Sequence, residues 1–239
     1  MNSLKRKSGY MAAILLAACL PQSALAVSQY SGSVDFTYFI TANNRNANGD
    51  MQFLSITDFL AVNPSVESGS SSYSSGYQEF SGLGVLHTLS FASQDSIAIG
   101  VSISEYFSDL KIEFSNNSTN LDDIYDISIE FNYMLTAQST GTFADADVFF
   151  FYSNENFDLD ELVIAHASSE TNSFDHIANS SSFSFVLAAG EVENIYFQSA
   201  VMGQLEATVV PIPTAIWLFV SGMVGLVGLR SKQLGTSMN

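Results

Sequence analysis

Carboxylates and histidines are the side chains of this sequence that could carry acid–base or metal chemistry. A glycosidase needs two carboxylates that face each other across a cleft, and close groups occur at three places: Asp122, Asp123 and Asp126; Asp145 and Asp147; Asp158, Asp160 and Glu161. The three histidines have no metal-ligand spacing: His87, His166 and His176. No Gly-x-Ser-x-Gly nucleophile motif is present. We therefore predict no catalytic residue, no cofactor and no metal site, in a chain that is not an enzyme.

A calcium loop is the main alternative to that prediction. From Asn44 to Asp50, side-chain oxygens stand at alternate positions ahead of Gly49, as in the first half of a calcium loop. The twelfth position is Ser55, where such a loop has a bidentate Glu. The same residues also suit a polar hairpin tip, in which Asn48-Gly49 supplies positive φ. Calcium therefore stays an open alternative to the absence of a cofactor.

Four consecutive aromatic residues, Phe149 to Tyr152, are the remaining candidate for binding. Because side chains alternate between the two faces of a strand, both faces of this strand are aromatic. Such a strand is either buried on both sides or carries an exposed aromatic platform for sugar rings. Core packing needs no ligand, whereas an aromatic platform with nearby carboxylates is how a β-sandwich would bind polysaccharide.

The charge pattern limits the partners of the chain. Between Val27 and Thr208 lie all 24 Asp and Glu residues but only two cations, Arg45 and Lys111, so this part has a net charge of −22. The other five Lys and Arg residues lie in the two terminal segments. A field of this sign repels nucleic acid and anionic membrane surfaces, and it favours cations and uncharged partners. It also keeps a secreted protein soluble.

Alternating apolar residues predict the strands that position these side chains. Each of the following sets marks one buried strand face: Val34 to Ile40, Ile97 to Ile103, Leu110 to Phe114, Ile127 to Leu135, Ala146 to Tyr152, Phe183 to Leu187 and Ile195 to Val201. Leu159 to Ala167 is the best helical candidate but is short, and Ser65 to Tyr77 suits a loop or a weak edge strand. We expect about nine to eleven strands in residues 27–208, folded as one antiparallel β-sandwich of jelly-roll-like type.

The N-terminus has the three parts of a secretory signal peptide: the basic Lys5-Arg6-Lys7, an apolar run from Met11 to Leu20, and the small-residue exit Ala24-Leu25-Ala26. We predict that residues 1–26 are a signal peptide cleaved after Ala26. A lipobox at Leu16-Ala17-Ala18-Cys19 is the alternative, with Cys19 as a lipidated N-terminus. Under the first interpretation the single cysteine is removed, and the exported domain folds without disulfides.

The C-terminal segment, residues 209–239, contains a short apolar stretch. Ala215 to Leu229 would form a helix of about 22 Å, against a hydrocarbon core of about 30 Å. Pro211 and Pro213 precede it, and prolines are tolerated before or at the start of a helix. Arg230 and Lys232 follow, and the positive-inside rule keeps them in the cytoplasm. We predict one short transmembrane helix that holds the exported domain before processing.

This segment resembles the C-terminal sorting signal of PEP-CTERM proteins in its Val-Pro-x-Pro variant. The matching residues follow the order of that signal: Val210, Pro211, Ile212, Pro213, Ser221, Gly222, Gly225, Arg230 and Lys232. Ser221 and Gly225 also form a small-x-x-x-small pair, which lets another helix approach closely. In that family an exosortase, a membrane-embedded cysteine protease, removes the tail and releases or transfers the protein outside the cell. The resemblance implies an exosortase-type protease as a partner.

Together these features predict a non-enzymatic exported protein of the cell surface or extracellular matrix, associated with exopolysaccharide or biofilm. We expect transient anchoring in the inner membrane, then a location at the cell surface or outside the cell, and no binding of nucleic acid. Two alternatives stay open for the sandwich: a carbohydrate-binding module, and a polysaccharide hydrolase.

Overall fold

The computed structural model describes residues 24–25, 27–46, 51–68, 71–154 and 160–210. Within these ranges the chain is all-β and contains no helix. One compact unit spans Ala26–Thr208, and a second is formed by Met1–Leu25 together with Val209–Asn239. The first of these units contains the core and every candidate binding surface considered below.

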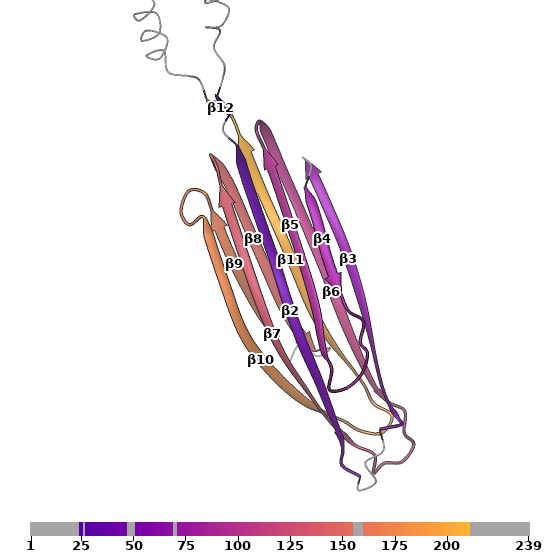
Figure 1. The fold of residues 1–239 in the computed structure, drawn as a ribbon. Helices are drawn as coiled ribbons and strands as arrows, with labels where there is room; N and C mark the ends of the chain where they lie inside the picture. Colours follow the sequence, from indigo (N-terminus) through magenta and orange to yellow (C-terminus); the bar gives the residue numbers. More distant parts are fainter. Residues whose placement is uncertain (1–23, 26, 47–50, 69–70, 155–159, 211–239) are drawn as a thin grey trace, which may run out of the picture. The chain divides into compact units, whose positions relative to one another are not determined.

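The unit Ala26–Thr208 contains two five-stranded antiparallel sheets (Figure 1). We name each sheet after its central strand. The β2 sheet has the order β10 (Phe174–Leu187), β7 (Tyr125–Thr140), β2 (Ser28–Asn44), β5 (Leu86–Ile97) and β4 (Ser72–Tyr77). The β11 sheet has the order β3 (Leu54–Ser68), β6 (Gly100–Asn116), β11 (Val192–Ala207), β8 (Phe143–Asn154) and β9 (Asp160–Ser168). The predicted all-β architecture of antiparallel sheets is confirmed.

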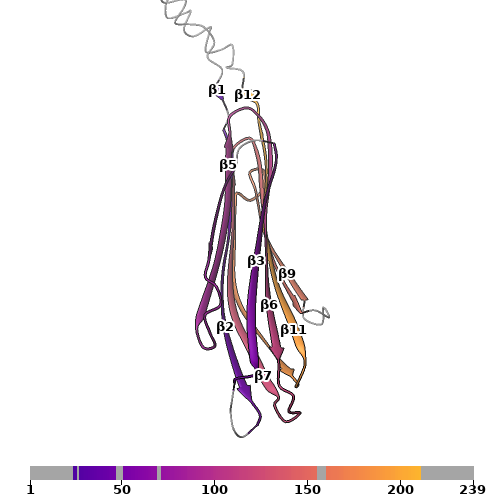
Figure 2. The same ribbon diagram turned by 90° about the vertical axis from the view of Figure 1, so that its right-hand side faces the viewer.

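Aromatic rings fill the space between the two sheets, which form two layers (Figure 2). Phe36 of β2 lies with its ring centroid 4.6 Å from that of Phe197 of β11 and 5.2 Å from that of Phe150 of β8. Phe131 of β7 lies 5.4 Å from Phe197. All four side chains are buried, at distances where tilted aromatic pairs attract one another beyond their loss of exposed area. The alternation of residues in the sequence therefore predicted correctly which face of each of these strands is buried.

The interior becomes polar toward the start of β2. The hydroxyl of the buried Tyr30 hydrogen-bonds with Ser93 Oγ at 2.8 Å and also with the Ser104 hydroxyl. Its ring lies against Gly203 of β11, where a Cβ atom would overlap the ring atoms. Nearby, a Cβ on Gly32 of β2 would lie 2.8 Å from Val148 Cγ2. Glycine at these two positions is therefore what lets the sheets close over this end of the core.

Two local predictions are corrected by the structure, and a third is decided by it. The alternation from Ile97 to Ile103 is not one strand face, because β5 ends at Ile97 and β6 begins at Gly100, whose φ of 94° makes the turn. Ile99 is 65% exposed as a result. The short helical candidate, Leu159 to Ala167, is instead edge strand β9, because its backbone from Asp160 pairs with β8. Of the segment Ser65 to Tyr77, the last six residues form β4, an edge strand.

Candidate functional site

An apolar groove lies on the outer face of the β11 sheet. Phe107 of β6, Ala200 of β11 and Phe149 of β8 are direct partners in one row across the sheet. Neighbouring strands are about 4.8 Å apart, so the two phenylalanines stand about 10 Å apart along this row, with the alanine methyl between them. The small alanine leaves a hollow of about 480 Å³. The groove therefore has an apolar floor and an aromatic wall on each side.

The next row of the same face adds hydrogen-bonding groups to the groove. Asp109, Gln198 and Phe151 are successive partners on β6, β11 and β8, and Ala61 of β3 lies opposite Asp109. Gln198 is exposed. The Oδ1 atom of Asp109 is buried and has no hydrogen-bond partner. This row thus places a carboxylate beside an amide that can both donate and accept hydrogen bonds.

The aromatic run that the sequence analysis identified supplies one wall of this groove. Phe150 and Tyr152 point into the core and are buried. Phe149 and Phe151 point outward, are half-buried, and line the groove. Both faces of the strand are therefore aromatic, as predicted. Phe150 and Tyr152 pack in the core, and Phe149 and Phe151 form a partly exposed aromatic surface.

A histidine–carboxylate pair borders the groove on the side of Met202. Met202, Asp147 and His166 are partners in the row next to that of Ala200. His166 Nδ1 lies 2.6 Å from Asp147 Oδ1, and both side chains are partly exposed. The other two histidines lie elsewhere, His87 buried in the core and His176 on edge strand β10. The structure therefore brings one of the three histidines to the border of the groove.

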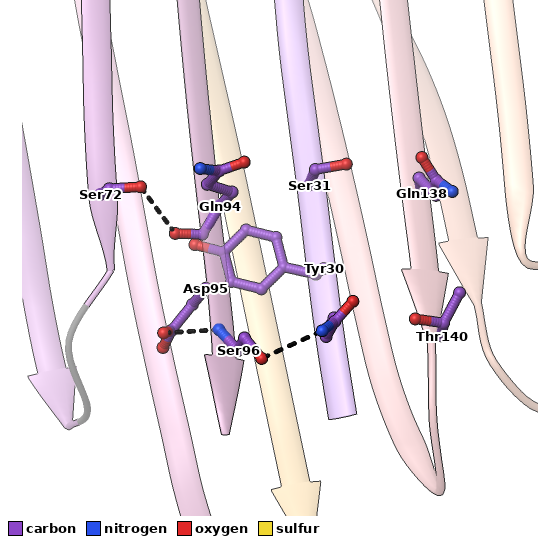
Figure 3. A pocket seen from close by; sticks show the side chains of 9 residues that line it. Tyr30, Ser31, Ser72, Gln94, Asp95, Ser96, Gln138 and Thr140 are labelled. Carbon is purple, nitrogen blue, oxygen red and sulfur yellow. Dashed lines mark hydrogen bonds between the residues drawn. The ribbon is translucent and has the colours of Figure 1, made fainter. Parts of the chain in front are cut away.

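A polar depression of about 450 Å³ lies at the start of β2 on the β2 sheet (Figure 3). Amides and hydroxyls from four strands line it: Gln29, Ser31, Ser72, Gln94, Ser96, Gln138 and Thr140. Gln29 Nε2 donates to Ser96 Oγ at 3.2 Å. The buried Asp95 accepts hydrogen bonds from its neighbour's N–H, at 2.7 Å, and from the Ser102 hydroxyl. The lining of this depression includes Tyr30, but that ring is buried, so it presents no exposed aromatic surface.

The first half of the alternative calcium loop is tied to the loop before β7. Ser118 Oγ donates to Asp123 Oδ2 at 2.6 Å, and Asn46 Nδ2 donates to Asp123 Oδ1 at 3.1 Å. These donors, with Asn44 Nδ2 at 3.4 Å, hold the pKa of Asp123 below its usual range. The two amides thus face the carboxylate through nitrogen, whereas calcium would need their oxygens. Residues 47–50 of the loop lie outside the described residues.

Both cations of the domain are paired with carboxylates. Arg45 donates from Nε to Asp126 Oδ2 at 2.9 Å and from Nη2 to Oδ1 at 2.6 Å, and this lowers the pKa of Asp126. Lys111 Nζ lies 2.9 Å from Glu113 Oε2. The folded domain therefore presents its negative charge with both of its Lys and Arg side chains already neutralised by neighbours.

A partly buried polar cluster that the sequence analysis missed is centred on Asp58 of β3. Asp58 accepts hydrogen bonds from the Tyr77 hydroxyl and from the Phe80 N–H, the latter at 2.8 Å. His87 is fully buried and stacks between Tyr38 and Phe80, with ring centroids 5.0 Å away on each side. Burial, and then the Asp58 carboxylate, raise the pKa of both tyrosines. Asp58 was the available signal, because it interrupts the apolar alternation of its strand.

The predicted carboxylate groups do not converge on one another in the described residues. Those residues contain no group of three or more His, Cys, Asp or Glu side chains that could hold a metal ion. Asp145 and Asp147 lie on the outer face of β8, and Glu161 accepts a hydrogen bond from the Tyr152 hydroxyl at 2.5 Å. Asp158 lies outside the described residues.

Most residues of the predicted cleavage and sorting signals lie outside the described residues: Cys19, Ala26, Pro211, Ile212, Pro213, Ser221, Gly222, Gly225, Arg230 and Lys232. Ala24 and Val210 are described, in β1 (Ala24–Leu25) and β12 (Val209–Val210), which pair antiparallel with these two residues opposite each other. Among the residues that the structure places, none forms a helix with the length and hydropathy of a membrane span.

The two antiparallel sheets and their shared aromatic core place the chain among all-β proteins built as sandwiches. No protein-family model matches the sequence, and no curated protein is similar to it. A solved structure that aligns with the chain is the secreted serine protease VesC from Vibrio cholerae, with 8% identity over 79% of this chain and a TM-score of 0.11. The chain spans about half (48%) of that structure, and a similarity this low supports no inference about fold or activity.

Proposed function

We propose that this chain is a non-enzymatic exported protein of the cell surface or extracellular matrix, associated with exopolysaccharide and sorted by an exosortase-type protease. The observation that carries the proposal is the order of three segments. A sequence with the parts of a signal peptide precedes one acidic domain, and a Val-Pro-x-Pro tail with an apolar stretch and two cations follows it. A jelly-roll-like topology for the domain is part of the same proposal.

The acidic domain supports a role outside the cell. A net charge of −22 keeps a protein dispersed and repels nucleic acid and anionic surfaces. The domain has no cysteine and so does not depend on disulfide formation after export. Its strands are long, with 17 residues in both β2 and β6, and the aromatic core joins the two sheets. These properties suit a durable structural protein whose partners are uncharged.

Intact-mass measurement of material secreted by cells that carry an exosortase tests the proposal. We expect a mature form that begins at Val27 and ends near Pro211. Replacing Pro211 and Pro213 together by Ala should keep the chain in the membrane, and so should deletion of the exosortase gene. Ile212→Leu is the matched control and should be released normally, because it changes the variable position between the prolines.

Four results would contradict the proposal. Normal release of the double proline variant would remove the sorting role of the tail. A secreted product that still contains Trp217 would show that the tail is not cut off, and an acylated Cys19 would show a lipoprotein. Release of labelled sugars from polysaccharide by the purified protein would replace the non-enzymatic role with that of a hydrolase.

A further inference from the structure

We infer that the groove on the outer face of the β11 sheet binds a neutral polysaccharide. This names the glycan partner of the exported protein proposed above and rests on that proposal. The groove combines a flat apolar floor at Ala200 with half-exposed rings on both sides, Phe107 and Phe149. Sugar rings have C–H faces that pack on aromatic rings and hydroxyl edges that need hydrogen-bond partners. The groove offers both kinds of contact in adjacent rows of one sheet.

The row of Asp109 and Gln198 supplies the hydrogen-bonding groups of the groove. A carboxylate accepts hydrogen bonds, and an amide both donates and accepts them. This row can therefore pair with the hydroxyls of a sugar whose ring packs on the groove floor. Gln198, the direct strand partner of Asp109, places an amide beside the same position. A purely apolar ligand would cover the exposed Gln198 amide without offering it a hydrogen-bond partner.

The charge of the domain selects a neutral ligand. Asp109 is the one charged residue among the described residues that line the groove. Polymers of uronic acids would meet this carboxylate and a domain of net charge −22, and both repel them. A second copy of the chain would bring another −22 against the same face, and a basic protein would find no cluster of acidic side chains in the groove. A neutral glycan has apolar ring faces and hydroxyl donors without these costs.

The extent of the groove suits a polymer. Its lining residues run from Ala61 on β3, across β6 and β11, to Phe151 on β8. Three spacings between neighbouring strands cover about 14 Å. This length exceeds that of a single sugar ring, so a short stretch of chain lies across the strands. The polar depression of the β2 sheet has no exposed ring among its described lining residues and lacks the stacking surface.

Affinity electrophoresis of the full-length chain tests the inference, in a detergent without a sugar headgroup. The gels contain dextran, mannan, galactomannan or hydroxyethylcellulose as neutral probes, and alginate as the anionic probe. We expect retardation in at least one neutral gel and none in alginate. Ala200→Met, which fills the groove, and Phe149→Ala, which removes a wall, should each raise the Kd about tenfold or more. Phe59→Ala is the matched control, since Phe59 is exposed on the same sheet but outside the groove lining.

Several outcomes would overturn the inference. They are no retardation in any neutral gel, equal retardation of the Ala200→Met variant, and stronger binding to alginate. Self-association that Ala200→Met abolishes, measured by analytical ultracentrifugation, would assign the groove to a second copy. Unchanged melting temperatures would show that the variants fold. Because the full-length chain is tested in detergent, binding is measured independently of export and cleavage, so a failure of this inference can be distinguished from a failure of the proposed function.

Discussion

Replacing Gly203 by Ala tests how the two sheets pack at the polar end of the core. A Cβ at this position overlaps the ring of Tyr30, which is buried and held by hydrogen bonds with Ser93 and Ser104. Overpacking a core costs about 1–3 kcal/mol, and the overlap with a hydrogen-bonded ring puts this case near 3. The alanine gains back roughly 1 kcal/mol by restricting the unfolded chain. We expect a net loss of about 2 kcal/mol in the free energy of unfolding.

Guanidinium unfolding and thermal melting would measure this loss. A domain of this size loses about 2–4 °C in Tm per kcal/mol, so Gly203→Ala should lower Tm by about 4–8 °C. Gly76→Ala is the matched control, because Gly76 is exposed on edge strand β4 and its substitution should stay within about 0.5 kcal/mol of the parent protein.

A double-mutant cycle assigns the loss to the ring. Tyr30→Ala removes the overlap, so adding Gly203→Ala to it should cost nothing or stabilise the protein by about 0.5 kcal/mol. The coupling energy should therefore be about 2 to 2.5 kcal/mol. In the Tyr30→Phe variant the ring remains, and the full penalty of Gly203→Ala should remain with it. An equal penalty in the Tyr30→Ala variant, or no penalty in the parent, would refute the facing of β2 and β11 described here.

Three further predictions concern pH and proteolysis. Asp123 has a lowered pKa in the folded state, so its contribution to stability is present above the unfolded pKa of about 3.9 and is lost as the pH falls through the folded pKa. Ser118→Ala removes a donor to this carboxylate and should therefore reduce the loss of stability between pH 6 and 3. An unchanged dependence of unfolding free energy on pH would contradict this. Tyr38 has a raised pKa in the folded state, so its contribution to stability is present below about pH 10 and is lost as the pH rises. Tyr38→Phe should therefore move alkaline unfolding to higher pH, as measured by the absorbance of the remaining phenolates. Trypsin should cut the native protein at Arg45 before Lys111, because Lys111 lies in β6 with a strand on each side, and early cutting at Lys111, detected by mass analysis, would contradict that position.

The strands could be predicted where apolar residues alternate because one strand face packs against the core. Phe36 and Phe150 alternate with polar or outward residues because one face of each strand meets the core. The same alternation gave a wrong prediction for Ile97 to Ile103, because the apolar residues continue through a tight hairpin. Ile99 in this hairpin is exposed and does not pack in the core. A glycine at the turn was the available local signal, and the apolar pattern outweighed it.

The groove could be predicted only in part. The aromatic run around Phe149 left a platform open beside core packing, because its outward rings follow from strand geometry alone. Phe107, Ala200 and Asp109 come from distant parts of the sequence, and they meet because of the register between β6, β11 and β8. That register depends on the whole sheet, and a shift of one residue would turn every one of these side chains to the other face.

The position of Ala200 on β11 gives the protein a mechanical property. This strand forms the floor of the groove and is the last long strand before the C-terminal segment, and it pairs with β6 on one side and with β8 on the other. A pull on the C-terminal end of β11 would act along the axis of that strand. Its hydrogen bonds run across that axis, so both ladders would resist in shear, with many bonds loaded at once. The same pull on an edge strand such as β9 would be borne by a single ladder. Force applied at this end of the domain would therefore be shared between two ladders, because the neighbours of β11 hold it on both sides.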